Sequence, residues 1–551
     1  MATYNEEFFR KLFERNFVYI RGFLRNVQRH GERVALIEAA SGKKWNYVQL
    51  NAEANRFANA LLSSGISPQD VVTYQLFNCP EFAFIYLGCQ KIGAINIPIN
   101  FRFSPQEIAH ILEDSRSKVY IFDASIKDNV KKALTLSSHK PEKMIVVGAD
   151  KNKEDGFAIN YNEFVYNASE NDPQDPDFFG VNAYKESTRL YTSGTTGLPK
   201  GVPLNNINEI MAIYDLMMAL HLNLDDVMLN ISPWFHRGGI HLGGPCPALY
   251  VGASIVAMKF FYPRTTLDVI SKYNVTFVVG VPTMYKFLVE EQKKRKKDLS
   301  KLKGAIAMGS PLNKELCLEM QKILTPNIYN GYGTSETFWN TLLLPYDLPQ
   351  HAGKIGRARM EDEVRVVKAY EDRLAEPDDI VAQDGQEVGE IIIKTLKASY
   401  DYLHKPEEVK HKVYRDWFYT GDMGVWDEDG YITVVSRKDD MIIVGGENIY
   451  PTIIEAAIEK HPKVMSCAVV GVPDPQRGEA LAAYVVKKDD TLTLEELKTF
   501  IQRDPALSQY YRPRYYCFVE ELPMTATGKK QHYILRQQAE KDLKEKRLIR
   551  S

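Results

Sequence analysis

The chain is poor in cysteine, and the cysteines it has are scattered. Its 551 residues include six, at positions 79, 89, 246, 317, 467 and 517, and no two of them form a CxxC pair. Histidine and cysteine residues do not cluster at the spacing of zinc ligands either. These absences exclude a disulfide framework and a zinc-binding module, and they predict free thiols in a reducing compartment.

Long apolar runs and an excess of one charge sign are also missing. The first 23 residues are amphipathic but interrupted by charges, which predicts neither a signal peptide nor a transmembrane segment. We expect this stretch to pack on its own domain rather than on a membrane surface. The formal net charge of -2 lacks the basic surplus typical of nucleic-acid-binding proteins, so nucleic acid is not expected as a partner. We therefore expect a cytoplasmic protein.

What the chain does contain is a globular composition and alternating elements. It is 44% hydrophobic and 25% charged, and its length suggests about three to four domain-sized units. From about residue 33 to 147, and again from 190 to 344, helical stretches alternate with short apolar strands, which predicts doubly wound parallel sheets. Short strands split by turns follow over about 350–437, and an independent α+β pattern follows that.

These patterns predict an α/β protein with a large N-terminal domain and a small C-terminal one. The N-terminal domain spans residues 1–438 and the C-terminal domain spans 439–551. Within the first, we expect two α/β subdomains, about 1–187 and 188–349, and a β-rich subdomain of about 350–437. Residues 171–186, rich in Pro, Asp and Asn, are expected to form a linker.

Residues 191–201 read YTSGTTGLPKG, which we call the glycine-rich loop. Three glycines allow backbone N–H groups to wrap an anion, four hydroxyls donate to phosphate oxygens, and Lys200 adds a positive charge. The loop is not a Walker A motif, because Leu198 and Pro199 separate Gly197 from the lysine. It predicts a nucleotide-phosphate cradle; the alternative is an ordinary surface loop.

Five further motifs follow in order: PWFHRGG (233–239), NGYGTSE (330–336), YTGD (419–422), SRKDDMIIVGGENIYP (436–451) and PMTATGK (523–529). With the glycine-rich loop, this series resembles the adenylate-forming superfamily along nearly the whole chain, and most closely an AMP-forming acyl-CoA synthetase. The resemblance implies that a carboxylate, ATP and CoA give acyl-CoA, AMP and pyrophosphate through an acyl-adenylate, with Mg²⁺. The reaction is close to reversible, and the C-terminal domain is expected to move between its two steps.

The resemblance also assigns residues. Lys529 would join the substrate carboxylate to the α-phosphate, Glu336 would hold Mg²⁺, and Asp439 would be the hinge. His236 gates the acyl pocket or is simply packed. The expected ATP and AMP ligands are Thr192, Ser193, Gly194, Thr195, Thr196, Gly197, Lys200, Gly309, Ser310, Pro311, Gly331, Tyr332, Gly333, Thr334, Ser335, Asp422 and Arg437. Among these, residues 309–311 and Tyr332 would contact adenine, and Asp422 and Arg437 would bind the ribose. Gly445, Gly446 and Glu447 would line the pantetheine tunnel.

The resemblance implies an acyl pocket built from the segment after Trp234 and from residues flanking Tyr332. Its expected lining is Trp234, Phe235, His236, Arg237, Gly239, Phe338 and Trp339, with Gly331 letting the acyl group pass close to the backbone. Aromatic walls favour a compact aromatic or alicyclic acid such as benzoate or cyclohexanecarboxylate, with a medium-chain fatty acid as the alternative. Arg237 binds a second carboxylate of a dicarboxylic acid, binds a CoA phosphate, or is exposed without a ligand.

The segment after Lys529 departs from the family pattern. The family often has G-K-x-x-R there, and this chain has His532 in place of arginine. The spacing around Lys529 matches that at which some relatives are acetylated by a lysine acetyltransferase. A luciferase and a peptide-synthetase module share the motifs, and a non-catalytic AMP sensor is the alternative of a different class. A homodimer is possible.

Overall fold

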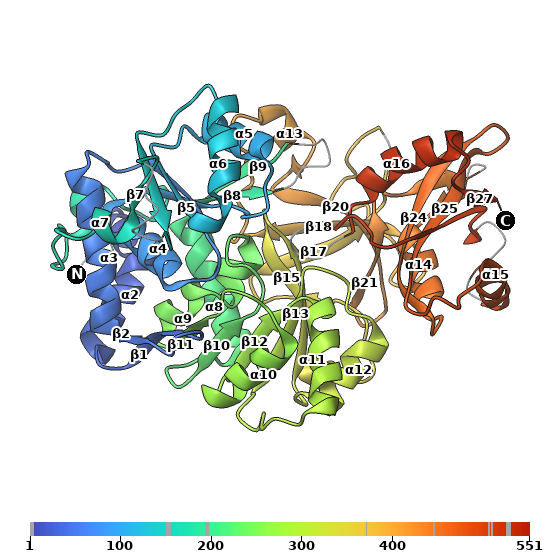
Figure 1. The fold of residues 1–551 in the computed structure, drawn as a ribbon, viewed down its shortest axis with the longest axis horizontal. Helices are drawn as coiled ribbons and strands as arrows, with labels where there is room; N and C mark the ends of the chain where they lie inside the picture. Colours follow the sequence, from blue (N-terminus) through green and yellow to red (C-terminus); the bar gives the residue numbers. More distant parts are fainter. Residues whose placement is uncertain are drawn as a thin grey trace. The chain divides into compact units, whose positions relative to one another are not determined.

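The computed structural model describes residues 5–149, 156–192, 198–370, 372–444, 447–504, 507, 511–524 and 530–550. The chain divides into two compact units, each built from two segments. Unit 1 consists of Met1–Val364 and Ile393–Phe418, and unit 2 consists of Arg365–Ile392 and Tyr419–Ser551. The predicted α/β fold class is confirmed (Figure 1), whereas the predicted domain and subdomain boundaries stay predictions.

The first sheet of unit 1 has seven strands in the described residues, in the order β7-β6-β5-β3-β4-β8-β9. All neighbouring pairs are parallel except β8 and β9. Its strands are β3 Val71–Gln75, β4 Ile95–Pro98, β5 Val119–Asp123, β6 Lys143–Val147, β7 Ile159–Asn160, β8 Glu186–Thr192 and β9 Lys200–Asn205. The apolar runs that predicted β3, β4 and β5 are buried along their whole length, as parallel strands covered on both faces require.

The second sheet has nine strands in the described residues, in the order β16-β15-β14-β13-β12-β10-β11-β1-β2. Strands β14, β13, β12, β10, β11 and β1 run parallel. The strands are β1 Val34–Glu38, β2 Lys44–Asn46, β10 Val227–Asn230, β11 Ser254–Ala257, β12 Phe277–Gly280, β13 Gly304–Met308, β14 Ile328–Thr334, β15 Phe338–Leu343 and β16 Arg357–Ala358. Membership does not follow chain order, because β1 and β2 lie here while β8 and β9 lie in the first sheet.

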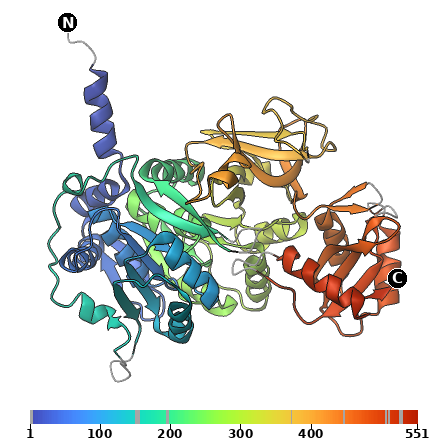
Figure 2. The ribbon, with the colours of Figure 1, turned by 90° about the horizontal axis from the view of Figure 1, so that it is seen from above.

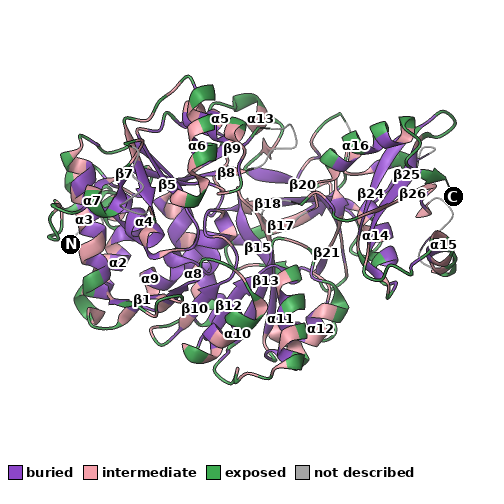
Figure 3. Cartoon of the chain, viewed as in Figure 1, coloured by how far each residue is buried: buried purple, intermediate pink, exposed green. Residues whose placement is uncertain are grey.

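The helices of unit 1 cover these sheets and fill the space between them. Every residue of α4 except Glu81 is buried, which is expected for a helix that is apolar all round. One core cluster contains side chains of β3, of β10, β12 and β13, and of α4 and α8, so a single core joins the two sheets (Figure 3). The helices are α2 Tyr19–His30, α3 Tyr47–Ser63, α4 Pro80–Ile92, α5 Pro105–Ser115, α6 Lys127–Leu136, α7 Tyr161–Phe164, α8 Asn206–Leu220, α9 Pro245–Val251, α10 Pro263–Lys272, α11 Pro282–Lys294, α12 Lys314–Ile323 and α13 Pro406–Lys410.

The N-terminal segment behaves in two ways. Helix α2 packs into the core through Tyr19, Ile20 and Phe23, as expected of this segment. Helix α1, Glu6–Asn16, buries none of its residues and stands away from the rest of unit 1 (Figure 2), with Phe8 60% exposed. The described helices include none that is both long enough and apolar enough to span a bilayer. All six cysteines lie among the described residues as free thiols, as predicted.

The β-rich pattern of about 350–437 corresponds to a third sheet. It has the order β17-β18-β20-β19, with β21 paired to β20. Its strands are β17 Asp362–Val367, β18 Gly389–Thr395, β19 Val413–Tyr414, β20 Trp417–Trp426 and β21 Ile432–Arg437. The short strands and intervening turns that predicted a distorted sheet here are present.

The last sheet lies wholly in unit 2, with the order β23-β22-β25-β26-β27 and β24 paired to β25. One core cluster contains α14 and α15 residues, and another contains α16 residues, so the sheet has an apolar core on each side. The elements are β22 Ile442–Val444, β23 Glu447–Ile449, α14 Pro451–Glu459, β24 Val464–Asp474, β25 Gly478–Lys487, α15 Leu494–Arg503, β26 Tyr515–Val519, α16 His532–Lys544 and β27 Ile549–Arg550. This α+β order matches the sequence pattern.

Candidate functional site

Three predicted motifs meet at one edge of the nine-stranded sheet. Residues 233–239 follow β10, residues 309–311 follow β13, and residues 331–336 form the end of β14 and the turn after it. Strands β10, β12, β13 and β14 are paired in parallel, with Met308 opposite Gly331, so their carboxyl ends lie at the same edge. In open α/β sheets, ligands bind outside this edge. The topology therefore brings together the predicted adenine and acyl segments.

The glycine-rich loop is closed by a hairpin of the other sheet. Thr192 at the end of β8 pairs with Lys200 at the start of β9, while residues 193–197 lie outside the described residues. The base of the loop is held by His110, whose Nε2 lies 3.0 Å from the carbonyl oxygen of Pro199. The Lys200 ammonium lies 2.8 Å from Oε1 of Glu408 on α13. The predicted phosphate-binding cation thus has an anionic partner from the same unit.

Glu336, the predicted Mg²⁺ ligand, is half-buried and oriented by hydrogen bonds. The Tyr402 hydroxyl donates to Oε1 of Glu336 at 2.6 Å, and the Ser399 N–H donates to the Glu336 carbonyl at 3.0 Å. A fixed carboxylate suits a hard cation that takes its remaining ligands from phosphate and water. Across the described ranges, no group of three or more histidine, cysteine, aspartate or glutamate side chains is arranged to hold a metal ion. Glu336 therefore fits Mg²⁺ as a single carboxylate ligand, with nucleotide phosphates and water as the other ligands.

Arg237 is directed into the protein. Its side chain is 2% exposed, so the interpretation of an exposed arginine is wrong. The guanidinium donates to the carbonyls of Ser335 at 3.0 Å, of Glu336 at 3.4 Å and of Lys397 at 2.7 Å. Burial lowers the pKa of this guanidinium to about 10, while Glu209 and Glu336 act in the opposite direction. Arg237 therefore holds the turn that carries Glu336. Its donors are used on main-chain carbonyls, which does not favour the predicted binding of a second substrate carboxylate or of a CoA phosphate.

The neighbouring predicted pocket residues are packed tightly. Nδ1 of His236 accepts a hydrogen bond from the Gly239 N–H at 3.0 Å, which fixes the ring against the turn. A Cβ on Gly239 would lie 1.9 Å from the Pro233 carbonyl oxygen, so only glycine fits at that position. Trp234 is 1% exposed and packs edge-on against Phe82 at a ring distance of 5.5 Å. It belongs to the core behind the turn.

Phe338 and Trp339 are both buried, and the Trp339 indole lies against Gly331. Phe338 has a φ of 67°, a left-handed conformation that costs a bulky residue about 1–3 kcal/mol. A Cβ added to Gly331 would lie 2.7 Å from Cε3 of Trp339. The indole therefore covers Gly331, whereas the sequence interpretation left this glycine open to the acyl group. Gly331 is needed for the close approach of the indole.

In unit 2, the two predicted ribose ligands are cross-strand neighbours. Asp422 on β20 lies opposite Arg437 on β21, and their side chains form an ion pair at 2.7 Å. The Arg437 guanidinium also donates to the Thr420 carbonyl at 3.1 Å. Asp439, the predicted hinge, is exposed in the turn between β21 and β22. The structure therefore brings Asp422 and Arg437 together, and the ribose and hinge roles stay predictions.

Several predicted site residues cannot be placed. Ser193, Gly194, Thr195, Thr196, Gly197, Gly445, Gly446 and Lys529 lie outside the described residues, and for Glu447 only the backbone is described. Lys530, the neighbour of the predicted catalytic lysine, contacts Glu455 at 2.8 Å and Glu459 at 2.9 Å. His532 lies 2.6 Å from the other oxygen of Glu455. The histidine that replaces the family arginine thus binds a carboxylate of α14.

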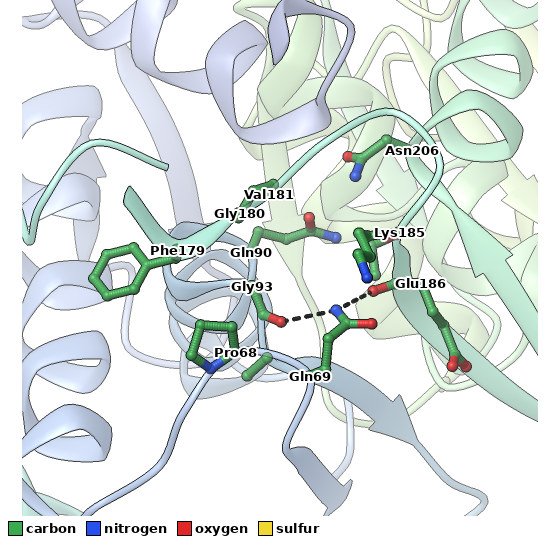
Figure 4. A pocket seen from close by; sticks show the side chains of 12 residues that line it. Pro68, Gln69, Gln90, Gly93, Phe179, Gly180, Val181, Lys185, Glu186 and Asn206 are labelled. Carbon is green, nitrogen blue, oxygen red and sulfur yellow. Dashed lines mark hydrogen bonds between the residues drawn. The ribbon is translucent and has the colours of Figure 1, made fainter. Parts of the chain in front are cut away.

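A separate cavity of about 240 Å³ lies elsewhere in unit 1 (Figure 4). Its lining includes Gly93 just before β4 and Lys185 just before β8, so it lies where those strands begin. The Gln69 side chain spans one side and donates to the carbonyls of Gly93 at 3.1 Å and Glu186 at 3.0 Å. The glycine-rich loop follows the other end of β8, so this cavity is not the nucleotide site.

Sequence reasoning missed Tyr402, Glu408 and Lys397, which lie within twelve residues of one another. This segment supplies the hydroxyl that donates to Glu336, the carboxylate that pairs with Lys200 and the main-chain carbonyl that accepts from Arg237. None of the three lies within a motif, and their partners are 60 to more than 200 residues away in the chain. The sequence therefore carried no local signal for them.

Comparison with known proteins identifies the family. The family model for AMP-binding enzymes matches residues 23–403, and the model for the C-terminal domain of AMP-binding enzymes matches residues 453–529. The chain belongs to the AMP-binding enzymes. This AMP-binding enzyme is an AMP-forming ligase of the acyl-CoA and acyl-carrier-protein ligase group.

Three similar proteins illustrate the group. A feruloyl-CoA synthase from an Amycolatopsis species is 32% identical to this AMP-binding enzyme over 89% of the chain and 92% of the relative. A fatty acid–[acyl-carrier-protein] ligase from Streptomyces coeruleorubidus is 31% identical over 89% of the chain and 90% of the relative. The crystal structure of an anthranilate CoA ligase with anthranoyl-AMP has a TM-score of 0.83 at 25% identity, covering 96% of this chain and 98% of that one.

Proposed function

We propose that this AMP-binding enzyme is an AMP-forming acyl-CoA synthetase for a compact aromatic or alicyclic carboxylic acid, such as benzoate or cyclohexanecarboxylate. The observation that carries the choice of acid is the closure of Gly331 by the Trp339 indole beside the buried Phe338 ring. Flat, rigid walls suit a flat or compact acid, because a flexible chain needs a long apolar channel. A medium-chain fatty acid is the alternative.

The similar proteins support this proposal in part. The feruloyl-CoA synthase and the anthranilate CoA ligase act, by their names, on aromatic acids. The fatty acid–[acyl-carrier-protein] ligase does not, and it also uses a different thiol. Identities near 30% leave the acid of this enzyme open, so the pocket walls carry the argument. A dicarboxylic acid is disfavoured, because the Arg237 guanidinium is buried on main-chain carbonyls.

The proposed roles follow from the charges of the reaction. A carboxylate must approach the α-phosphate of ATP, so cations have to be arranged in advance. Lys529 would join the two anions, Glu336 would hold the Mg²⁺ that neutralises phosphate charge, and Lys200 would stabilise the leaving pyrophosphate. Asp422 and Arg437 hold the ribose. The roles proposed for Gly445, Gly446 and Glu447 are to line the CoA tunnel once the hinge at Asp439 has turned.

The test is a panel of ring and chain acids assayed for CoA-dependent AMP release, with kcat/KM compared across the panel. We expect the highest kcat/KM for acids with one or two rings. Lys529→Gln should abolish AMP release, whereas Lys541→Gln, at an exposed residue of α16, should not. Acetylated Lys529 should behave as the glutamine variant, because acetylation removes the same charge. AMP binding without AMP release from any acid would instead indicate a non-catalytic AMP sensor.

The thiol acceptor is tested separately. Holo-acyl-carrier protein replaces CoA in the same assay, since one similar protein is an acyl-carrier-protein ligase by name. Thioester formation with CoA supports the proposal. Thioester formation with the carrier protein and not with CoA would show that the enzyme is an acyl-carrier-protein ligase.

A further inference from the structure

A cluster of buried charges surrounds Trp339. Lys397 is 1% exposed, and its ammonium lies 2.7 Å from Asp215, 2.6 Å from Asp362 and 2.7 Å from the Trp339 carbonyl oxygen. Arg359 donates to the second oxygen of Asp215 at 3.0 Å. Two acidic side chains, Asp215 and Asp362, are thus paired with two basic ones, Lys397 and Arg359. We call Asp215, Arg359, Asp362 and Lys397 the ion cluster.

The ion cluster holds Trp339 at two points. The indole Nε1–H donates to Oδ2 of Asp215 at 2.9 Å, and the main-chain carbonyl accepts from Lys397. Both bonds are charge-assisted and nearly dry, because Asp215 is 2% and Trp339 4% exposed. A side chain held at its backbone and at its ring nitrogen has little freedom to turn away. The six-membered ring of the indole lies against Gly331.

The ion cluster also supports the neighbouring pocket residue. The Lys397 ammonium lies 5.9 Å from the centre of the Phe338 ring, and the Arg237 guanidinium lies 5.6 Å from it. Two cations within reach of one ring favour its position by cation–π attraction. This attraction helps to offset the left-handed φ of Phe338. The wall is thus fixed by charge as well as by shape.

Buried ion clusters are costly to desolvate and add little stability, so a structural purpose alone explains this one poorly. We propose that the ion cluster fixes Trp339 as the end wall of the acyl pocket and so limits the enzyme to compact acids, with Asp215 as the positioning residue. This inference rests on the proposed function and names the part of the chain that sets its substrate range. A long chain would have to displace the indole and break its bond to a buried carboxylate.

The test compares the ratio of kcat/KM for decanoate to kcat/KM for benzoate in the full-length enzyme. We expect W339A to raise this ratio at least about tenfold, since the vacated space accepts methylene groups. W339L keeps more of the core volume and replaces W339A if that variant does not fold. It should also raise the ratio. The matched control is Trp45→Leu, a buried tryptophan on β2, which should leave the ratio unchanged.

Asp215 is tested through the indole that it holds. The chain has five tryptophans, so ¹⁵N-tryptophan labelling gives one indole signal per residue, and W339L assigns the one from Trp339. We expect Asp215→Asn to move that signal and to raise the decanoate to benzoate ratio by about threefold, because a neutral acceptor binds the N–H less strongly. A purely structural Asp215 would lower stability without changing the ratio.

The outcomes separate the inference from the proposed function. AMP release from benzoate-sized acids in the wild type, with an unchanged ratio in W339A and W339L, overturns the inference alone. A wild type that prefers decanoate to benzoate contradicts both the inference and the compact acid of the proposed function. No AMP release with any acid contradicts the proposed function and the inference together.

Discussion

The Tyr402 hydroxyl donates a 2.6 Å hydrogen bond to the carboxylate of Glu336. This bond joins a segment without any motif to the predicted Mg²⁺ ligand, and it sets the direction in which the remaining carboxylate oxygen points. A positioned ligand binds metal and phosphate more tightly than a mobile one, because the ordering cost is already met by the fold.

Tyr402→Phe removes that bond and keeps the ring, which packs on Leu190, Val202 and Leu204. We expect a rise in KM for MgATP of at least about tenfold, because a hydrogen bond to a charged group contributes roughly 1.5–3 kcal/mol. Titration of MgATP at saturating acid measures it. Tyr400→Phe, whose hydroxyl accepts from the Thr395 N–H, is the control. An unchanged KM in Tyr402→Phe contradicts a metal role for Glu336.

Glu408→Gln is expected to act in the opposite direction. The Glu408 carboxylate occupies the Lys200 ammonium at 2.8 Å and so competes with nucleotide phosphate. Its loss should lower KM for ATP by about threefold to fivefold, the range of a partly exposed ion pair of about 1 kcal/mol. Glu407→Gln, next to it and paired with Lys410 at the surface, controls for net charge. A higher KM in Glu408→Gln would show that the ion pair positions Lys200 instead.

The sequence predicted where several strands lie, but it did not predict which strands pair. Apolar runs predicted β3, β5 and β12, because a strand buried on both faces must be apolar throughout. They did not predict that β1 would pair with β11, where Leu36 lies opposite Ile255. Pairing across more than 200 residues depends on the assembled core, which a local pattern does not contain.

In the site, too, the sequence predicted some residues but not the contacts that support them. Asp422 and Arg437 were predicted to share a ribose, and they lie opposite one another on neighbouring strands. Arg237 was expected on a ligand or at the surface, because a charge is normally kept in water. Its partners are main-chain carbonyls, which no side-chain pattern records. The motifs therefore indicated the ligand-binding edge, and the supporting contacts required the fold.

Glu455 makes the stability of unit 2 sensitive to acid. Burial disfavours its ionised form, but Lys530 and His532 outweigh burial and lower the pKa of Glu455 from 4.5 to about 2. A lowered folded-state pKa contributes stability above the unfolded value, and this contribution is lost as the pH falls from about 4.5 towards 2. At pH 3 the loss should be on the order of 2 kcal/mol relative to pH 7.

Hydrogen exchange of the α14 amides in the intact chain measures this effect, with Glu455→Gln compared at each pH. The wild type should be more protected than the variant at pH 6, and the difference should shrink towards pH 3. A difference that stays constant over this range would mean that Glu455 does not titrate as described.

Asp439→Pro tests the hinge. Asp439 is exposed in the turn after β21, and proline fixes its φ and restricts Lys438 before it. We expect ATP–pyrophosphate exchange to persist and thioester formation to fall by at least about a hundredfold, since only the second step needs the turn to change. Asp439→Ala keeps the backbone freedom and should retain both steps. Equal loss of both half-reactions in Asp439→Pro refutes the assignment.

The central claim is that a carboxylate oxygen of the acid attacks the α-phosphate of ATP. Benzoate labelled with ¹⁸O in its carboxylate tests this directly, by mass spectrometry of the nucleotide after complete conversion with CoA. Attack at the α-phosphate transfers one labelled oxygen to the phosphate of AMP, and the account predicts AMP that carries one ¹⁸O. Unlabelled AMP, or label found in inorganic phosphate beside ADP, would contradict it.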